Sequence, residues 1–234
     1  MPLPNLRIVA VLLLACAATS PALAEADPGD CLGVDYDAKR PLTVAKVVAA
    51  PRAQFVKSHW EDAACPADTE ACRAKAYLVP GDLALTGAIR GPYTCVAYQS
   101  PRDKKQIWTT GWIATASLAP VARTPARKPS DWIGTWAHAG GEITIAAGKK
   151  GALEIAGEQT YPGAQEVHSG VIGATAIPAD DMLVFADNGK IAFDKADDDA
   201  CHVRMQRIGA LLLVEDNGHC GGSSVTFTGL YRRQ

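Results

Sequence analysis

The chain has 234 residues and a formal net charge of −2, from 25 acidic and 23 basic side chains. This length is enough for one large or two small domains, each with a modest hydrophobic core. The charge balance and the lack of base- or phosphate-recognition motifs exclude a nucleic-acid-binding protein of the usual basic kind.

The first 24 residues have the pattern of a secretory signal peptide. Arg7 precedes an apolar run over residues 8–17 that is too short to span a bilayer, and small residues close the segment at positions 22–24. We expect cleavage after residue 24 and a periplasmic or secreted protein without a transmembrane segment. Residues 13–16 also resemble the lipobox of bacterial lipoproteins, so a lipid anchor at Cys16 is the alternative.

Six cysteines remain after removal of Cys16, and an even set in an exported chain predicts three disulfides. In the C-terminal half the one available pair is Cys201–Cys220. The four N-terminal cysteines allow three pairings, among which we favour Cys65–Cys72, across a short loop, and Cys31–Cys95. The spacing of Cys65 and Cys72 is too wide for a zinc knuckle, and we expect no metal or cofactor.

The composition changes at residues 119–130, APVARTPARKPS, where prolines and basic residues interrupt any apolar period. This segment predicts an extended, solvated linker. It divides the mature chain into residues 25–118 and 131–234, which we expect to fold independently.

The N-terminal half has strand-like runs separated by turn residues at 80–82 and 91–92, and a further strand in LTVAKVVAA, residues 42–50. Gly111-Trp112-Ile113, followed by Ser117-Leu118-Ala119-Pro120, resembles the end of bacterial SH3-like domains. There a Gly-Trp strand leads into a short 3₁₀-like turn and an apolar stop. The resemblance covers about residues 75–120 and implies a small antiparallel barrel.

Small barrels bind peptides and glycans in shallow grooves lined by flat aromatic rings. We therefore predict ligand contacts from Tyr98, Trp108 and Trp112, with Tyr77 and Tyr93 as further candidates. A role in the core is the alternative for each ring, above all for Trp112 in the Gly-Trp motif.

The C-terminal half begins with Gly134-Thr135-Trp136, which resembles the Gly-x-Trp element on the first strand of lipocalins and avidins, together called calycins. The resemblance implies that Trp136 closes one end of a barrel and that Arg232 or Arg233, near the last strand, packs over its ring. Trp132 would lie at the mouth. A biotin site of the avidin kind is not expected, because no tryptophan follows Trp136.

The rest of this half alternates with the period of strands. Residues 142–157 and 182–193 each predict a hairpin, and residues 201–231 predict three more strands. The expected inward positions in the last segment are Val203, Met205, Val225, Phe227 and Tyr231. About eight strands in about 100 residues are typical of a small closed barrel. The predicted fold class is all-β, with an SH3-like barrel followed by a calycin-like barrel.

No catalytic constellation is evident. The histidines lack metal-binding spacing, Ser223-Ser224 lacks a nucleophile elbow, and the acidic run around Asp197 lacks the glycine and glutamate of a calcium loop. We predict a non-enzymatic binding protein of the bacterial cell envelope that contacts peptidoglycan or a protein partner, with lysozyme inhibitors as a subset by analogy. The alternatives are a carrier of a small apolar ligand in the C-terminal barrel, or a hydrolase, if a histidine and a carboxylate meet in a cleft.

Overall fold

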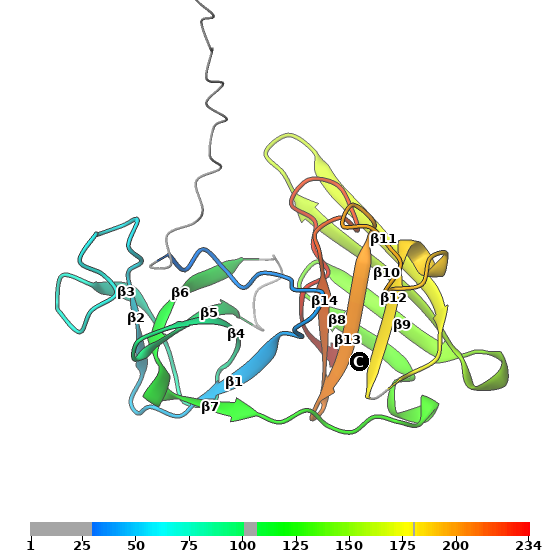
Figure 1. Cartoon of the computed structure of the whole chain (residues 1–234), viewed down its shortest axis with the longest axis horizontal. Helices are drawn as coiled ribbons and strands as arrows, with labels where there is room; N and C mark the ends of the chain where they lie inside the picture. The colour runs from blue at the N-terminus through cyan, green and yellow to red at the C-terminus, as the bar shows by residue number, and fades with distance from the viewer. Residues whose placement is uncertain (1–29, 101–106, 180) are drawn as a thin grey trace, which may run out of the picture.

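The computed structural model describes residues 30–100, 107–179 and 181–234. The predicted signal peptide and Cys16 lie outside these residues. The described chain folds as two antiparallel sheets, β1–β7 and β8–β15, which stand side by side (Figure 1). Within the described residues, none of the helices is both long and apolar enough to cross a membrane.

The first sheet has seven strands in the order β3-β2-β6-β5-β4-β1-β7. The turns predicted at residues 80–82 and 91–92 separate β3, β4 and β5, and a 3₁₀ turn, η1 (Thr115–Ser117), follows β6 as expected. The strands are β1 (Thr43–Val47), β2 (Ala53–Val56), β3 (Arg73–Leu78), β4 (Leu83–Arg90), β5 (Tyr93–Gln99), β6 (Trp108–Ala114) and β7 (Leu118–Val121).

Both faces of β6 are covered. Trp112 packs among the Cys31–Cys95 and Cys65–Cys72 disulfides on one face, and Ile113 packs against Phe55 and Val96 on the other. Because neither side chain retains exposed surface, this strand anchors both clusters of the sheet. The two predicted pairings in this half are confirmed.

The second sheet has eight antiparallel strands in the order β11-β10-β9-β8-β15-β14-β13-β12 and curls into a nearly closed barrel. At the seam, β11 and β12 do not pair, and Gly173 N–H instead donates to Asn188 Oδ1 at 3.1 Å. The strands are β8 (Gly134–His138), β9 (Gly141–Ala147), β10 (Leu153–Pro162), β11 (Val167–Ala176), β12 (Met182–Ala186), β13 (His202–Ile208), β14 (Leu211–Asp216) and β15 (Gly229–Arg233).

The hairpin predicted over residues 182–193 is wrong. After β12 the chain makes a 3₁₀ turn, η4 (Asp187–Gly189), and a single bridge joins Ala186 to Ile191. The positive φ of Asn188 (56°) and Gly189 (77°) does turn the chain, but toward β11. The turn covers the open seam between β11 and β12. The pairing partner of β12 is β13, not the segment that follows the turn.

The interior of the barrel is filled by large side chains from all eight strands and from the segments before β8 and β15. Trp132, Trp136, Phe227, Tyr231 and Met205 are all fully buried in one continuous cluster. These five side chains have no exposed surface, so the barrel is filled at these positions. The inward parity predicted for residues 203, 205, 227 and 231 is confirmed.

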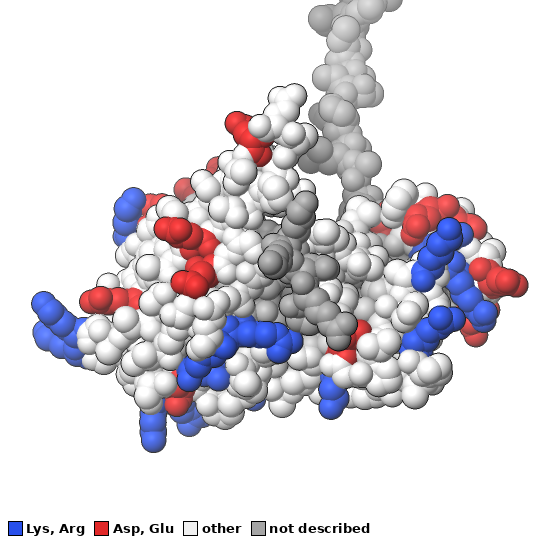
Figure 2. Space-filling view, turned by 180° about the vertical axis from the view of Figure 1, so that it is seen from behind, with Lys and Arg blue, Asp and Glu red and all other residues white. Residues whose placement is uncertain are grey.

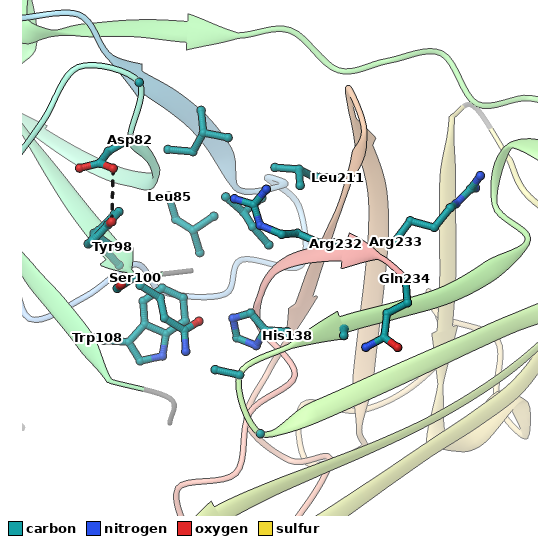
Figure 3. A pocket seen from close by; sticks show the side chains of 18 residues that line it. Asp82, Leu85, Tyr98, Ser100, Trp108, His138, Leu211, Arg232, Arg233 and Gln234 are labelled. Atoms are coloured by element: carbon teal, nitrogen blue, oxygen red, sulfur yellow. Dashed lines mark hydrogen bonds between the residues drawn. The ribbon is translucent and has the colours of Figure 1, made fainter. Parts of the chain in front are cut away.

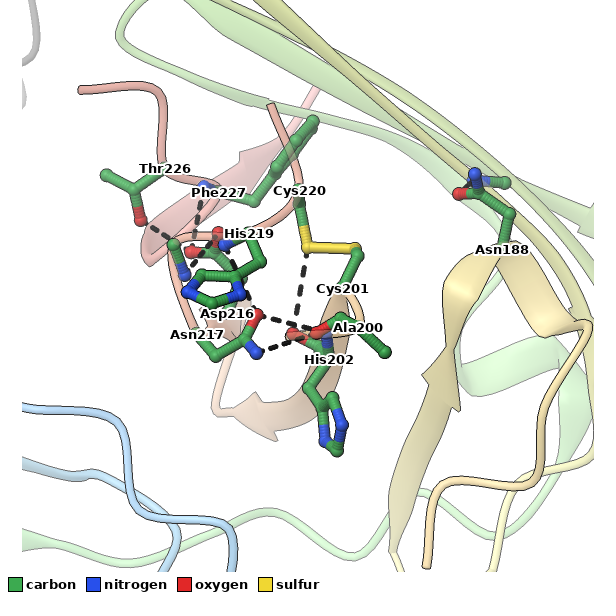
Figure 4. Close-up of a disulfide and its surroundings, with 12 residues drawn as sticks. Asn188, Ala200, Cys201, His202, Asp216, Asn217, His219, Cys220, Thr226 and Phe227 are labelled. Carbon is green, nitrogen blue, oxygen red and sulfur yellow. Dashed lines mark hydrogen bonds between the residues drawn. A yellow bond between two sulfur atoms is a disulfide. The ribbon is translucent and has the colours of Figure 1, made fainter. Parts of the chain in front are cut away.

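The third disulfide, Cys201–Cys220, joins the start of β13 to the loop after β14, as predicted (Figure 4). Asn217 supports it: its Nδ2 donates to Ala200 O at 2.7 Å, and its Oδ1 accepts from His202 N–H at 3.1 Å. Asp216, which is buried, accepts hydrogen bonds from the N–H groups of Phe227 and Thr228. The disulfide and these hydrogen bonds therefore hold the loop after β14 against the start of β13 and the segment before β15.

Trp136 lies at one end of the barrel with its ring faced by two guanidinium groups. The carbons Cζ of Arg207 and Arg233 each lie 4.7 Å from the ring centroid, within the range of a cation–π contact. Gly134 makes room for this: at its φ of +146°, an added Cβ would lie 3.2 Å from Arg233 Nε. Of the two arginines predicted at this ring, the structure places Arg233 there and directs Arg232 elsewhere.

Residues 119–130 are more ordered than an extended, solvated linker. Residues 119–121 complete β7, which pairs with β1, and Thr124 N–H donates to Arg207 O. Ala126 is buried, and its carbonyl accepts from Trp132 Nε1–H at 2.8 Å. The prolines disfavour helix, but the small side chain of Ala126 allows the segment to pack against the barrel end.

The two sheets share a hydrophobic cluster as well as having cores of their own. Leu42, Val44 and Leu85 from the first half pack against Ile208 and Leu213 of the second. Figure 1 shows the N-terminal segment, in blue, running from the first sheet to β14 and back into β1. This shared cluster fixes how the sheets meet.

Buried polar groups accompany this cluster. Glu215, which has no exposed surface, accepts hydrogen bonds from Leu42 N–H at 2.9 Å and from Gln206 Nε2 at 2.8 Å. Its cross-strand partner Arg204 donates to Asp37 O at 2.8 Å and lies over the Tyr36 ring. The N-terminal segment thus supplies the groups that satisfy these two charges.

Trp136→Ala should lower the free energy of unfolding by about 3–5 kcal/mol, because it empties a fully buried aromatic site. In double-mutant cycles read by urea denaturation, Arg233→Ala should couple to Trp136 by about 0.5–2 kcal/mol. Arg232→Ala, one residue away on the opposite side of the strand, is the matched control and should show no coupling. Equal coupling for both arginines would contradict the assignment.

Burial raises the pKa of Glu215 above its ordinary value, because the charged form loses hydration in the fold. Its contribution to stability is full below the ordinary pKa of 4.5 and is lost as the pH rises through the raised value. Glu215→Gln should remove this pH dependence. Glu215→Leu should cost about 2–4 kcal/mol at every pH, because Leu42 N–H and Gln206 lose their acceptor. Urea denaturation across this range measures both, and an unchanged slope in Glu215→Gln would refute the assignment.

Candidate functional site

A cleft of about 700 Å³ opens where the two sheets meet. Its first wall comes from the turn before β4 and from β4, β5 and β6, and its second from β8, the start of β14, and β15 (Figure 3). The apolar lining contains Leu85, Leu211 and Leu230, of which Leu85 belongs to the shared cluster and Leu230 packs against it. The cleft therefore depends on contact between the sheets and exists in neither alone.

Two of the three predicted ligand-binding residues line this cleft. Trp108, at the start of β6, and Tyr98, near the end of β5, are both half-buried, and Tyr98 Oη donates to Asp82 Oδ1 at 3.3 Å. Trp112 is the exception, because it lies in the disulfide cluster with no exposed surface. The prediction of a ligand contact for Trp112 is therefore corrected to a core role, because the two disulfides and their neighbours cover its ring completely.

His138, the last residue of β8, stands between aromatic rings from both halves. Its ring centroid lies 4.8 Å from that of Tyr231 and 6.4 Å from that of Trp108. Gly229 permits this position, since a Cβ there would lie 2.5 Å from His138 Nε2. The contact with Trp108 brings the two walls together at one end of the cleft.

The His138 imidazole is neutral at physiological pH. Burial lowers its pKa from 6.5 to about 4, because the charged form loses hydration. Its Nδ1 is buried and has no hydrogen-bond partner among the described residues. The ring therefore acts in the cleft as an uncharged aromatic surface with a polar edge.

Among the described residues, the charged side chains that line the cleft are Asp82, Arg232 and Arg233. Asp82 also accepts from Val79 N–H at 2.8 Å, so both of its carboxylate oxygens are engaged. The guanidinium of Arg233 is turned away toward Trp136, and that of Arg232 points into the cleft (Figure 3). On the face in Figure 2, groups of both signs are interspersed, and no field of a single sign covers it.

This arrangement is suited to recognition. It joins flat rings, an apolar floor and a few polar groups in an open groove whose volume lies in the range of ligand sites, about 300–1,000 Å³. Nowhere in the described ranges do three or more potential metal ligands come together, and this includes the acidic run at Asp194 and Asp197–Asp199. Glu142 and Glu158, which are directly opposite on neighbouring strands, are both exposed, and neither lines the cleft.

Comparison with known proteins adds no relative: no family model matches the chain, and neither a curated protein nor a solved structure is significantly similar to it.

Sequence reasoning identified the aromatic wall but missed the rest of the site. The histidine spacing bears only on metal binding and does not single out His138. The residues around Asp82 predict only a turn. The sequence contains one signal for His138. It is the last residue of the strand opened by Gly134-Thr135-Trp136, and its side chain lies on the same face of that strand as Trp136. Its neighbours Trp108 and Tyr231 are far away in the chain, so only the fold brings them together.

His138 should make the protein acid-sensitive. A histidine with a lowered pKa contributes stability that is present above pH 6.5 and is lost as the pH falls toward 4. We expect the free energy of unfolding to fall over this range by up to about 3 kcal/mol more in the wild type than in His138→Asn. The exposed His219→Asn is the control and should keep the wild-type slope. An NMR titration that finds the His138 pKa near 6.5 would contradict this.

Proposed function

We propose that this chain is an exported, non-enzymatic binding protein of the bacterial cell envelope that holds its ligand in the cleft between an SH3-like and a calycin-like unit. The observation that carries the proposal is the cleft itself, which is lined by Tyr98 and Trp108 from one sheet and by His138 and Arg232 from the other. Ring surfaces combined with polar edges are the usual means by which proteins hold glycans and peptides.

The three disulfides support an oxidising compartment, because such bonds persist in the periplasm and outside the cell. They agree with the secretory pattern of residues 1–24. A periplasmic or secreted location places peptidoglycan and envelope proteins within reach. Peptidoglycan fragments are the first candidate, because the groove is open enough for a chain of sugar rings and is lined by rings on which sugars stack.

The carrier alternative has less support. A carrier of an apolar ligand needs a hollow barrel, but the interior side chains of β8–β15 leave no exposed surface inside. The hydrolase alternative requires a histidine oriented by a carboxylate. In the described part of the chain, His138 makes no hydrogen bond to a carboxylate, and Asp82 is engaged by Tyr98 and Val79.

Addition of soluble peptidoglycan fragments should change the intrinsic tryptophan fluorescence and give a saturable titration. Trp108→Ala should weaken the affinity at least tenfold with a small effect on stability, because the ring is half-buried at the cleft. Trp108→Phe should retain most of the binding.

The matched control is Trp60→Ala, which removes a ring that is 65% exposed and is not part of the cleft. Its affinity should equal that of the wild type. The proposal fails if Trp108→Ala and Trp60→Ala bind alike, or if the wild type binds no fragment. Pull-down from an envelope extract, repeated with Trp108→Ala, tests the protein-partner form of the same proposal.

A further inference from the structure

The last strand divides two adjacent arginines between two environments. Because successive side chains of a strand point to opposite faces, Arg233 reaches Trp136 and Asp131 O, and Arg232 points into the cleft (Figure 3). Arg232 lies opposite Leu211 and Ala137 in the strand register, and both also line the cleft.

Arg232 is the cation of the cleft that the protein does not use for itself. Arg233 and Arg207 donate to backbone carbonyls and contact Trp136. By contrast, within residues 30–100, 107–179 and 181–234 Arg232 has neither a hydrogen bond from its side chain nor an ion pair. Asp82, the acidic residue of the same cleft, lies beyond ion-pair distance from it and is held by Tyr98 and Val79.

The surroundings of Arg232 specify the shape of its counter-ion. Arg232 lies opposite Leu211 and shares the cleft with Leu85, Leu230 and the ring of Trp108, and His138 adds no charge at neutral pH. A single guanidinium matches a single carboxylate, with which it makes two parallel hydrogen bonds. A dianionic phosphate would call for further cations or a cluster of N–H donors, which this cleft lacks among its described residues.

We infer that Arg232 binds the carboxylate of an acidic saccharide whose sugar ring lies against Trp108. This inference rests on the proposed function and names its ligand class: glycans with a free carboxylate, either peptidoglycan fragments with acidic sugars or peptide stems, or oligosaccharides of uronic acids. Neutral glycans would use the ring surface alone and bind more weakly.

Titration calorimetry on the full mature chain tests the inference with three probes: a disaccharide-peptide fragment of peptidoglycan, a uronic acid oligosaccharide, and a neutral N-acetylglucosamine oligomer. Arg232→Gln should weaken binding of the carboxylated probe about 10–100-fold and leave the neutral probe unchanged. Arg232→Lys should restore part of the affinity, because lysine keeps the charge without the paired donors. Arg52→Gln, an exposed arginine outside the cleft, is the control.

Each outcome decides between the ideas. Binding of either acidic probe that depends on Arg232, with an affinity that falls as salt is added, supports the inference, and the probe that binds identifies the source of the carboxylate. Equal binding of neutral and acidic probes, or an unchanged affinity in Arg232→Gln, overturns the inference and leaves the proposed function in place. If the wild type binds none of the probes, the proposed function fails as well.

Discussion

The outer face of β13 and β14 is buried where a free-standing barrel would expose it to water, and it carries both apolar and polar side chains. Leu213 and Ile208 on this face are buried by Leu42, Val44 and Leu85 of the other half. All six residues of β14 are buried, so this strand is covered on both faces. The remaining features of the molecule depend on this contact, because it fixes the distance and angle between the sheets and forms the floor of the cleft.

The contact also determines where charges can be buried. Glu215 and Arg204 lie on the same covered face, and the segment before β1 supplies Leu42 N–H and Asp37 O to them. Burial of an ion costs several kcal/mol unless hydrogen bonds replace its hydration. The polar pairs therefore favour one arrangement of the segment over its alternatives. The Cys31–Cys95 disulfide ties the start of that segment to β5, which restricts it further.

Function, in this view, arises between the halves. Trp108 contributes a ring from the first sheet, whereas His138 and Arg232 come from the second, and His138 is kept neutral by the same burial that packs it between rings. The two side chains on opposite faces of β15 have different surroundings: Arg233 packs over Trp136, and Arg232 points into the cleft where we propose that a ligand binds. The two arginines are adjacent in the sequence, and this is enough to separate their surroundings because successive side chains of a strand point to opposite faces.

Local patterns in the sequence determined much of this protein. Alternation and turn residues predicted the all-β class and most of the strands. The even number of cysteines predicted three disulfides, and the resemblance of the Gly-x-Trp element placed Trp136 inside the barrel of the C-terminal half. Such features depend on neighbours within a few residues or within one hairpin.

The tertiary structure alone decided the rest. It moved Trp112 into the core, made residues 187–189 a cover for the seam, packed Ala126 against the barrel and brought Trp108 to His138. Residues 211–214 are apolar on both faces of their strand, and the pattern does not state which surface covers the outer one. These outcomes depend on residues far apart in the chain. An alternating pattern indicates which side of a strand is buried, but it does not indicate which other part of the protein covers that side.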